Sequence, residues 1–267
     1  QETIDRFEIG FAPDSWDALV QHIQRHNQTA IRDAETVGLI GKGKKGIYAR
    51  FKNRIMFPVH NRTGEVIAFS GRDMSNQPDA AKYYNSSDSS LFTKGKVLFG
   101  VYQARSAIRD QDRAIVVEGN VDVLTLSQNG FGETVAPMGT ALTLEQCALI
   151  KRMTNNVVLI YDGDDAGQAA TLKAIPHCLS EGLSGRVVTL KADQDPDTLL
   201  RTQGAEALEK LIEKSPPLFD YVIEDAMRHF DGTIPSASAV VKKVKPLFAM
   251  LPNRMESDMY ESKLAQR

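Results

Sequence analysis

The sequence of 267 residues predicts an α/β protein in three parts: a mixed α+β basic subdomain, a parallel-sheet α/β module and a C-terminal helical bundle. Three observations support this fold class. Positive charge is concentrated in residues 41–109, short apolar runs alternate with helical patterns from residue 113, and helical patterns alone follow residue 213. Alternating strands and helices are typical of a parallel sheet. We therefore place the three subdomains at residues 1–111, 112–213 and 214–267.

The composition is that of an ordinary globular protein, with 42% hydrophobic and 25% charged residues. No apolar run approaches the roughly 20 residues that span a bilayer. The first ten residues lack the basic and apolar stretches of a signal peptide, so we expect a cytoplasmic protein without membrane association. Cys147 and Cys178 lie in expected helices without CxxC or Cys/His spacing, so we expect core packing rather than a zinc site.

Charge is unevenly distributed along the chain. Residues 41–109 hold thirteen Lys or Arg against four Asp or Glu, whereas residues 1–40 carry a net charge of −4 and residues 110–267 one of −7. A basic region beside an acidic one is typical of a polyanion-binding groove next to a metal site. Uneven charge on a solvated surface is the alternative, and charge alone does not exclude it.

The first part begins with two expected helices. Asp14 and Ser15 are candidate caps for a helix over residues 16–24, and Thr29 for a second helix that ends near Gly38. Residues 41–46 are rich in glycine and lysine, which favours a flexible loop or a hairpin tip.

A hairpin is expected next. Residues 47–59 alternate apolar and basic side chains and then become apolar, which predicts one strand. Residues 61–64 form a turn and residues 65–72 the returning strand. The polar stretch 73–96 contains amides, hydroxyls, aromatic rings and lysines, which suit a nucleotide or a phosphate backbone, although an ordinary surface loop is the alternative.

The second part contains four expected strands and their helices. The strands are residues 114–117, 134–136, 157–161 and 186–190. The apolar run 157–161 fits a strand buried on both faces. Thr143 and Gln146 form a capping box for one helix, and Pro176 is expected to kink or end another that starts at Asp165.

Acidic residues follow three of these strands. Glu118 follows the first, Asp162 and Asp164 the third, and Asp195 and Asp197 the fourth. Because parallel strands end at one sheet edge, these carboxylates should lie together. Asp162 and Asp164 repel each other unless a cation lies between them, and hard oxygen ligands suit Mg²⁺ or Mn²⁺. A strand-to-helix turn with Asp165 as the N-cap is the alternative.

The third part is expected to be helical. A helix should follow Ser215, and further helices should span residues 236–250 and 253 to the end. The last helix has no stop signal, so we expect the chain to be a fragment of a longer protein.

Eight motifs occur in a fixed order along the chain. In the basic part they are Phe51-x-Asn53-Arg54-Ile55-Met56-Phe57-Pro58, Gly71-Arg72, Lys82-Tyr83-x-Asn85-Ser86 and Lys94-Gly95-Lys96. In the sheet part they are Val117-Glu118-Gly119-x-x-Asp122-Val123, Gly139-Thr140-Ala141-Leu142-Thr143, Tyr161-Asp162-Gly163-Asp164-x-Ala166-Gly167 and Asp195-Pro196-Asp197. Over residues 4–215 the chain resembles the RNA polymerase core of bacterial DnaG-type primases, which contains a Toprim module. It departs from that pattern at Asn120-Val121 and at Ser87.

The resemblance implies DNA-templated synthesis of RNA primers from nucleoside triphosphates by two or more Mg²⁺ or Mn²⁺ ions. It assigns catalysis and metal binding to Glu118, Asp162 and Asp164, with Asp122, Asp195 and Asp197 completing the acidic cluster. Glu118 is alternatively a general acid or base. The residues implied to bind nucleic acid or nucleotide are Arg50, Arg54, Arg72, Lys82, Asn85 and Lys94.

The resemblance also implies partners. These are a single-stranded DNA template, nucleoside triphosphates and the RNA–DNA hybrid product, in a monomeric protein of the bacterial cytoplasm. We expect the zinc-binding domain that precedes such cores to be missing. We likewise expect the replicative helicase to bind through a C-terminal domain absent from this chain. Two other functions remain: another Toprim phosphotransfer reaction, topoisomerase- or nuclease-like, and an inactive module that binds single-stranded DNA.

Overall fold

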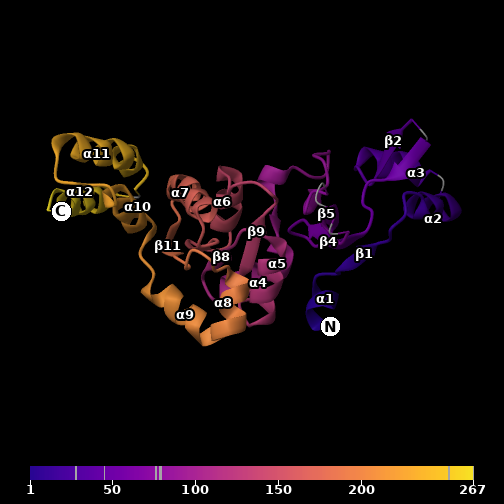
Figure 1. The fold of residues 1–267 in the computed structure, drawn as a ribbon, viewed down its shortest axis with the longest axis horizontal. Helices are drawn as coiled ribbons and strands as arrows, with labels where there is room; N and C mark the ends of the chain where they lie inside the picture. Colours follow the sequence, from indigo (N-terminus) through magenta and orange to yellow (C-terminus); the bar gives the residue numbers. More distant parts are fainter. Residues whose placement is uncertain (28, 45, 76, 78–79, 252, 267) are drawn as a thin grey trace. The chain divides into compact units, whose positions relative to one another are not determined.

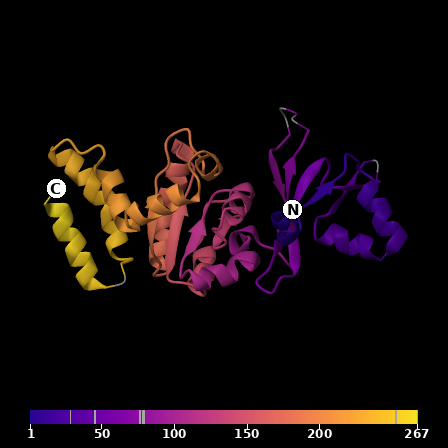
Figure 2. The ribbon, with the colours of Figure 1, turned by 90° about the horizontal axis from the view of Figure 1, so that it is seen from below.

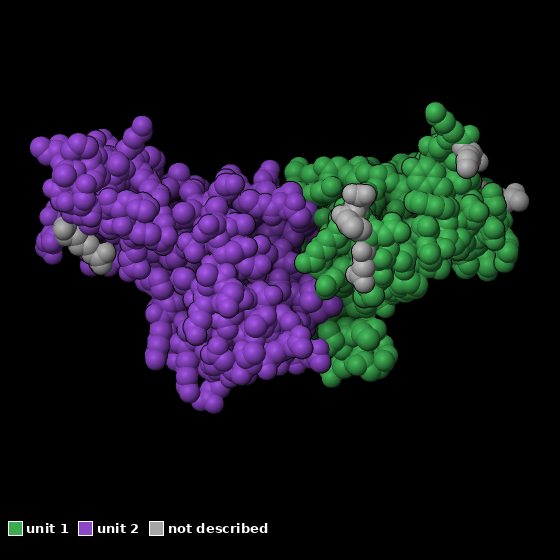
Figure 3. Space-filling model, viewed as in Figure 1, with its two compact units in different colours: residues 1–103 green, residues 104–267 purple. Residues whose placement is uncertain are grey.

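The computed structural model describes residues 1–267 except residues 28, 45, 76, 78–79, 252 and 267. The chain folds into two compact units, residues 1–103 and 104–267 (Figure 3). The elements that begin in the first unit are α1 (Glu2–Arg6), β1 (Gly10–Ala12), α2 (Ala18–His26), α3 (Ala30–Thr36), β2 (Ile40–Gly43), β3 (Gly46–Ala49), β4 (Arg54–His60), β5 (Val66–Asp73), β6 (Tyr83–Asn85), the 3-10 helix η1 (Lys94–Lys96), β7 (Leu98–Phe99) and α4 (Val101–Asp110).

The first unit is built on an antiparallel sheet in the order β1-β4-β5-β6. Its centre is the predicted hairpin, in which β4 and β5 pair from Arg54 opposite Asp73 to His60 opposite Val66. Phe57 and Val59 of β4 are buried and anchor this sheet in the core. The hairpin expectation is confirmed.

The expectation of one continuous strand over residues 47–59 is wrong. β3 ends at Ala49 and pairs with β2 as a separate antiparallel hairpin, whose tip is the glycine- and lysine-rich segment; Lys45 lies outside the described residues. The chain turns between β3 and β4 because Asn53 adopts a left-handed φ of 49° and its N–H donates to the Pro13 carbonyl. Alternation of period two continues across the turn, so the sequence pattern did not mark the break.

Helices α2 and α3 pack beside the β2-β3 hairpin. Val20, Ala34 and Ile40 form the buried centre of that cluster. The first of these helices begins after Asp17 rather than at residue 16, and the Ser15 hydroxyl accepts a hydrogen bond from the Ala18 N–H at 3.1 Å.

The elements of the second unit that follow α4 are β8 (Ala114–Val116), α5 (Asn120–Gln128), β9 (Thr134–Pro137), α6 (Leu144–Lys151), β10 (Asn156–Ile160), α7 (Asp165–Ser180), β11 (Ser184–Val188), α8 (Pro196–Gln203), α9 (Ala205–Lys214), α10 (Leu218–Met227), α11 (Ile234–Phe248) and α12 (Arg254–Ala265). The strands of this unit pair in parallel in the order β11-β10-β8-β9.

β10 occupies the middle of this sheet because residues Val157–Ile160 are apolar and buried on both faces. Helices α5 and α8 contact each other on one face, and α6 and α7 contact each other on the other (Figure 1). Parallel pairing brings the carboxyl ends of β8, β10 and β11 to one edge. The predicted mixed α/β architecture is confirmed.

In the second unit, the sequence predicted the start of one helix and the burial of the cysteines correctly, but it did not predict where another helix ends. The capping box of α6 is present: the Thr143 hydroxyl accepts from the Gln146 N–H at 3.2 Å, and Gln146 Oε1 accepts from the Thr143 N–H at 3.0 Å. Cys147 and Cys178 are buried in α6 and α7, as predicted. Pro176 does not end α7, which continues to Ser180, because packing of the helix against α6 and β11 outweighs the one backbone bond that proline removes.

The C-terminal helices form a group beside the sheet. α10 contacts β11 and α7, whereas α11 and α12 lie beyond α10 (Figures 1 and 2). The Phe219 ring of α10 lies 5.1 Å from the Phe248 ring and 4.5 Å from the Tyr260 ring, which joins the three helices. None of the helices in the described part of the chain has the length and apolar composition needed to cross a bilayer.

Candidate active site

Carboxylates from three neighbouring strands meet at the carboxyl edge of the parallel sheet. Glu118 follows β8, Asp162 follows β10 and Asp195 precedes α8 after β11. Although Glu118 and Asp162 are 44 residues apart, Glu118 Oε1 accepts a hydrogen bond from the Asp162 N–H at 3.0 Å. The strand order therefore creates this acidic edge, as the sequence pattern predicted.

Burial and mutual repulsion raise the pKa values of two carboxyl groups at the acidic edge. Burial raises the pKa of Asp122, in the first turn of α5, to about 7, and the charges of Asp162, Asp195 and Glu118 add to that rise. A hydrogen bond from the Gly119 N–H, 3.0 Å from Asp122 Oδ2, opposes it. Burial also raises the pKa of Glu118, with a further contribution from the charge of Asp164. Several negative charges thus lie close together around the desolvated Asp122, while Glu118 and Asp164 are exposed, and this concentration of charge favours a bound cation.

Two of the acidic residues also cap helices. Asp164 Oδ1 accepts from the Gly167 N–H at 2.8 Å, and Asp195 Oδ1 accepts from the Thr198 N–H at 2.6 Å. The alternative of a strand-to-helix turn was thus right about the turn, but the cap of α7 is Asp164 and not Asp165. Capping uses Oδ1 and holds each carboxylate at the sheet edge in a defined orientation.

The glycines of the Asp162–Gly167 segment permit close backbone approach. A Cβ atom on Gly163 would lie 1.7 Å from the Lys191 carbonyl oxygen, and one on Gly167 would lie 2.1 Å from the Asp162 carbonyl oxygen and 2.8 Å from Glu118 Oε1. The Gly163 N–H also donates to the Gln194 carbonyl at 3.0 Å. These positions require glycine because no side chain fits between the segments.

Asp197 has different surroundings from the other acidic residues. Its Oδ1 accepts from the Thr125 hydroxyl at 2.8 Å, and its Oδ2 lies 3.5 Å from Arg201 Nη1. The bond from Thr125 joins α8 to α5, whereas Arg201 pairs with Asp197 within α8. Sequence reasoning missed Thr125, although it lies three residues after Asp122 and hence on the same side of a helix.

The acidic edge fits an open cation site better than a closed one. No group of three His, Cys, Asp or Glu side chains within the described residues is close enough to hold a metal by itself. Magnesium, however, keeps several water ligands and binds through one or two carboxylates together with substrate phosphates. An all-oxygen donor set with raised pKa values at Asp122 and Glu118 therefore suits such an ion.

The first unit holds the predicted basic residues around β4, β5 and β6. The guanidinium carbons of Arg50 and Arg54 lie 5.5 and 5.9 Å from the centre of the Tyr84 ring, and that of Arg72 lies 6.0 Å from the centre of the Tyr83 ring. Stacked arginine and tyrosine side chains are typical of surfaces that bind single-stranded nucleic acid.

The remaining basic-surface residues differ in their exposure. Arg54 is largely buried and its Nη1 donates to the carbonyls of Gly71 at 2.9 Å and Ala81 at 3.0 Å, so it also supports the sheet. Lys82, immediately before β6, is exposed, whereas Asn85 and Lys94 are partly buried.

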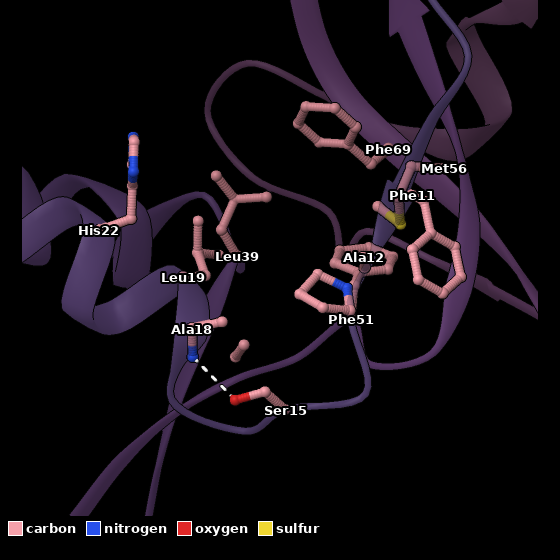
Figure 4. Close-up of a pocket in the computed structure, with 12 residues that line it drawn as sticks. Phe11, Ala12, Ser15, Ala18, Leu19, His22, Leu39, Phe51, Met56 and Phe69 are labelled. Atoms are coloured by element: carbon pink, nitrogen blue, oxygen red, sulfur yellow. Dashed lines mark hydrogen bonds between the residues drawn. The ribbon is translucent and has the colours of Figure 1, made fainter.

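An apolar cavity of about 350 Å³ also lies in the first unit (Figure 4). Phe11, Met56 and Phe69 line one part and Leu19 of α2 another. The Ser15 hydroxyl at its rim already accepts from the Ala18 N–H. Because desolvated charge is costly in such surroundings, this cavity does not suit phosphate or metal.

Comparisons with known proteins first identify the class. Residues 112–189 match the family model of the Toprim domain, which implies use of a divalent metal ion. Residues 1–105 match the N-terminal domain of the DNA primase catalytic core, and residues 219–267 match the DnaB-helicase binding domain of primase.

Similar solved structures and sequences then define the family. A DNA primase domain from Pseudomonas aeruginosa is 32% identical with a TM-score of 0.91, over 100% of this chain and 84% of that one. The Escherichia coli primase catalytic core is 34% identical with a TM-score of 0.89, over 99% of this chain and 85% of that one. A DnaG primase catalytic domain bound to single-stranded DNA is 34% identical with a TM-score of 0.89, over 100% of this chain and 87% of that one. The chain belongs to the family of DnaG primase catalytic cores.

The chain spans 44% of the length of the DNA primase of Escherichia coli K12, with which it is 37% identical over 94% of its own length. The expectation that the helicase-binding region is absent is wrong, because residues 219–267 match that domain. The sequence pattern of this region showed only amphipathic helices, which carry no signature of a particular partner.

Proposed function

We propose that this chain synthesises short RNA primers from nucleoside triphosphates on a single-stranded DNA template during bacterial DNA replication. The observation that carries the proposal is the acidic edge, where Glu118 accepts a hydrogen bond from the Asp162 backbone, and where burial, together with the neighbouring carboxylates, raises the pKa of Asp122. The family relationship supports the same conclusion.

In this proposal the acidic residues hold two or more Mg²⁺ or Mn²⁺ ions. Glu118, Asp162 and Asp164 are the principal ligands, and Asp122, Asp195 and Asp197 complete the cluster. Bound metal ions stabilise the attacking 3′-oxygen and the departing pyrophosphate. The bond from the Asp162 N–H fixes the Glu118 carboxylate, and the raised pKa of Glu118 also supports the alternative role of general acid or base.

The basic surface of the first unit would hold the template or the incoming triphosphate. Lys82 is the best placed for direct contact with a phosphate because it is exposed. Tyr83 and Tyr84 are consecutive in β6 and point to opposite faces of the sheet, so Tyr84 offers a ring beside Arg50 on one face and Tyr83 a ring beside Arg72 on the other. Arg54, Asn85 and Lys94 complete this surface. A solved relative bound to single-stranded DNA supports the binding of such a template, although it does not assign these residues.

Partners and surroundings follow from the same proposal. The RNA–DNA hybrid is the product, and residues 219–267 contact the replicative helicase, as the matching family description implies. The chain acts as a monomer in the bacterial cytoplasm. Single-stranded DNA, nucleoside triphosphates and Mg²⁺ or Mn²⁺ are then sufficient for the basic reaction.

The test is formation of a dinucleotide from triphosphates on single-stranded DNA with Mg²⁺ or Mn²⁺. Asp164→Asn should lower the rate at least about 100-fold while the protein stays folded, because asparagine caps helices as well as aspartate does. Asp193→Asn is the matched control, since Asp193 is exposed and outside the proposed ligand set. A fully active Asp164→Asn protein would contradict the metal assignment.

The same preparation separates the competing functions. Metal-dependent cleavage of DNA without synthesis would favour a topoisomerase- or nuclease-like reaction. Binding of single-stranded DNA with neither reaction would favour an inactive binding module.

A further inference from the structure

A cavity of about 370 Å³ in the second unit lies beside Glu118, at the end of the sheet where the acidic residues gather. Gly139, Thr140 and Ala141, in the loop after β9, form one wall. Helix α7 forms another, and Glu118 is the member of the proposed acidic ligand set that lines it. The volume falls within the range of about 300–1,000 Å³ typical of ligand pockets. The function proposed above leaves this cavity and the Gly139–Thr143 motif without a role.

The wall supplied by α7 consists of small side chains and one lysine. Ala166, Ala170 and Lys173 line the cavity and have the i, i+4, i+7 spacing of one helical face. The two alanines leave space, and the exposed Lys173 places a positive charge at the margin. Within the part of the chain that the structure describes, the Lys173 side chain forms no ion pair or hydrogen bond. Sequence reasoning missed this lysine, although its spacing from Ala166 and Ala170 was visible.

The loop wall supplies hydrogen-bond donors. Gly139 has a φ of 71°, a left-handed conformation that turns the chain sharply after β9. The backbone N–H groups of Gly139, Thr140 and Ala141 and the Thr140 hydroxyl donate no hydrogen bond to any described residue. Consecutive N–H donors in a turn with a left-handed residue are a recurring way of binding anions. A lysine and several donors thus surround one cavity.

We propose that this cavity binds the β- and γ-phosphates of the nucleoside triphosphate, with Lys173 as their counter-charge. The inference rests on the proposed function, because it assigns a place to part of that substrate. Glu118 belongs both to the acidic edge and to the cavity wall, so a polyphosphate in the cavity extends from the site where the α-phosphate reacts. Lysine is suited to this role as a compact charge that follows a mobile anion.

The experiment compares the binding of ATP, AMP and single-stranded DNA to the whole chain by titration calorimetry in Mg²⁺. Lys173→Ala should weaken ATP binding about tenfold, which is typical of one hydrogen bond to a charged group. AMP binding should not change, because AMP lacks the two distal phosphates. DNA affinity and its dependence on salt should also remain as in the wild type. Lys173→Arg keeps the charge and should retain ATP binding within about threefold.

Lys210→Ala is the matched control. Lys210 is another exposed lysine of the second unit, and it pairs with Glu206 at 2.6 Å, away from the cavity lining. The Lys210→Ala variant should leave the binding of ATP, AMP and DNA unchanged. Because Lys173 and Lys210 are both exposed, neither substitution removes a buried contact, and circular dichroism of each variant verifies the fold.

Three outcomes would overturn the inference. They are unchanged ATP binding in Lys173→Ala, an equal loss for ATP and AMP, and a loss of DNA affinity in place of ATP affinity. The last outcome would assign Lys173 to the template. Failure of the proposed function gives a different result: no primers are made by the wild type, although ATP binding still depends on Lys173. Primer synthesis with ATP binding independent of Lys173 would refute the cavity assignment alone.

Discussion

Replacing Asp122 with asparagine should stabilise the metal-free protein above pH 7. Burial and the neighbouring charges raise the pKa of Asp122 from an ordinary value of 3.8 to about 7 in the folded protein. Between these values the folded state retains a proton that the unfolded state has lost. The free energy of unfolding therefore falls as the pH rises from about 4 to about 7, and it is level above that window.

The magnitude follows from the size of the shift. Roughly three pKa units, at about 1.4 kcal/mol each, correspond to about 4 kcal/mol lost at pH 8. Asparagine carries no charge, and its side-chain oxygen can still accept from the Gly119 N–H. Its amide must nevertheless be desolvated, so we expect a gain of about 2–4 kcal/mol. Most substitutions are destabilising by about 1 kcal/mol, which makes the expected sign distinctive.

Urea denaturation followed by circular dichroism, in EDTA at pH 5 to 8, measures this effect. Asp193→Asn removes the same charge from an exposed position and should change the free energy of unfolding by less than about 0.5 kcal/mol. Added Mg²⁺ should stabilise the wild type more than Asp122→Asn, because binding to the folded state relieves the repulsion. Equal stability and equal pH dependence of wild type and Asp122→Asn would refute the account of the acidic edge.

Three further substitutions test the site and the basic surface. Gly163→Ala should destabilise the protein by about 3 kcal/mol or more and abolish synthesis, because its Cβ would lie 1.7 Å from the Lys191 carbonyl oxygen; wild-type urea stability would contradict the requirement for glycine. Arg54→Ala should cost about 2 kcal/mol by removing its bonds to two carbonyls, and an unchanged melting temperature would show that these bonds do not support the sheet. Lys82→Ala should leave stability within about 0.5 kcal/mol and, if Lys82 binds the template, reduce the slope of log affinity against log salt by roughly 0.7. If neither the salt dependence of DNA affinity nor triphosphate binding changed, Lys82 would have no role in binding the template or the nucleotide.

Sequence alone determined the features that depend on near neighbours. The apolar run 157–161 predicted a strand buried on both faces, which the structure places at Asn156–Ile160, and Thr143 with Gln146 specified the start of α6. Because parallel strands end together, the acidic residues after β8, β10 and β11 also specified one sheet edge. The family motifs could also be recognised without the structure, because their order and spacing are properties of the sequence itself.

Tertiary structure decided what depends on distant partners. Asn53 breaks the expected strand by bonding to Pro13, Pro176 remains inside a packed helix, and Asp197 contacts Thr125 of another helix. The requirement for Gly163 comes from the carbonyl of Lys191, and the cavity at Lys173 exists because α7 lies beside the loop after β9. Periodicity and capping reflect interactions within a few residues. Burial, repulsion and close approach are set by residues that only the folded chain brings together.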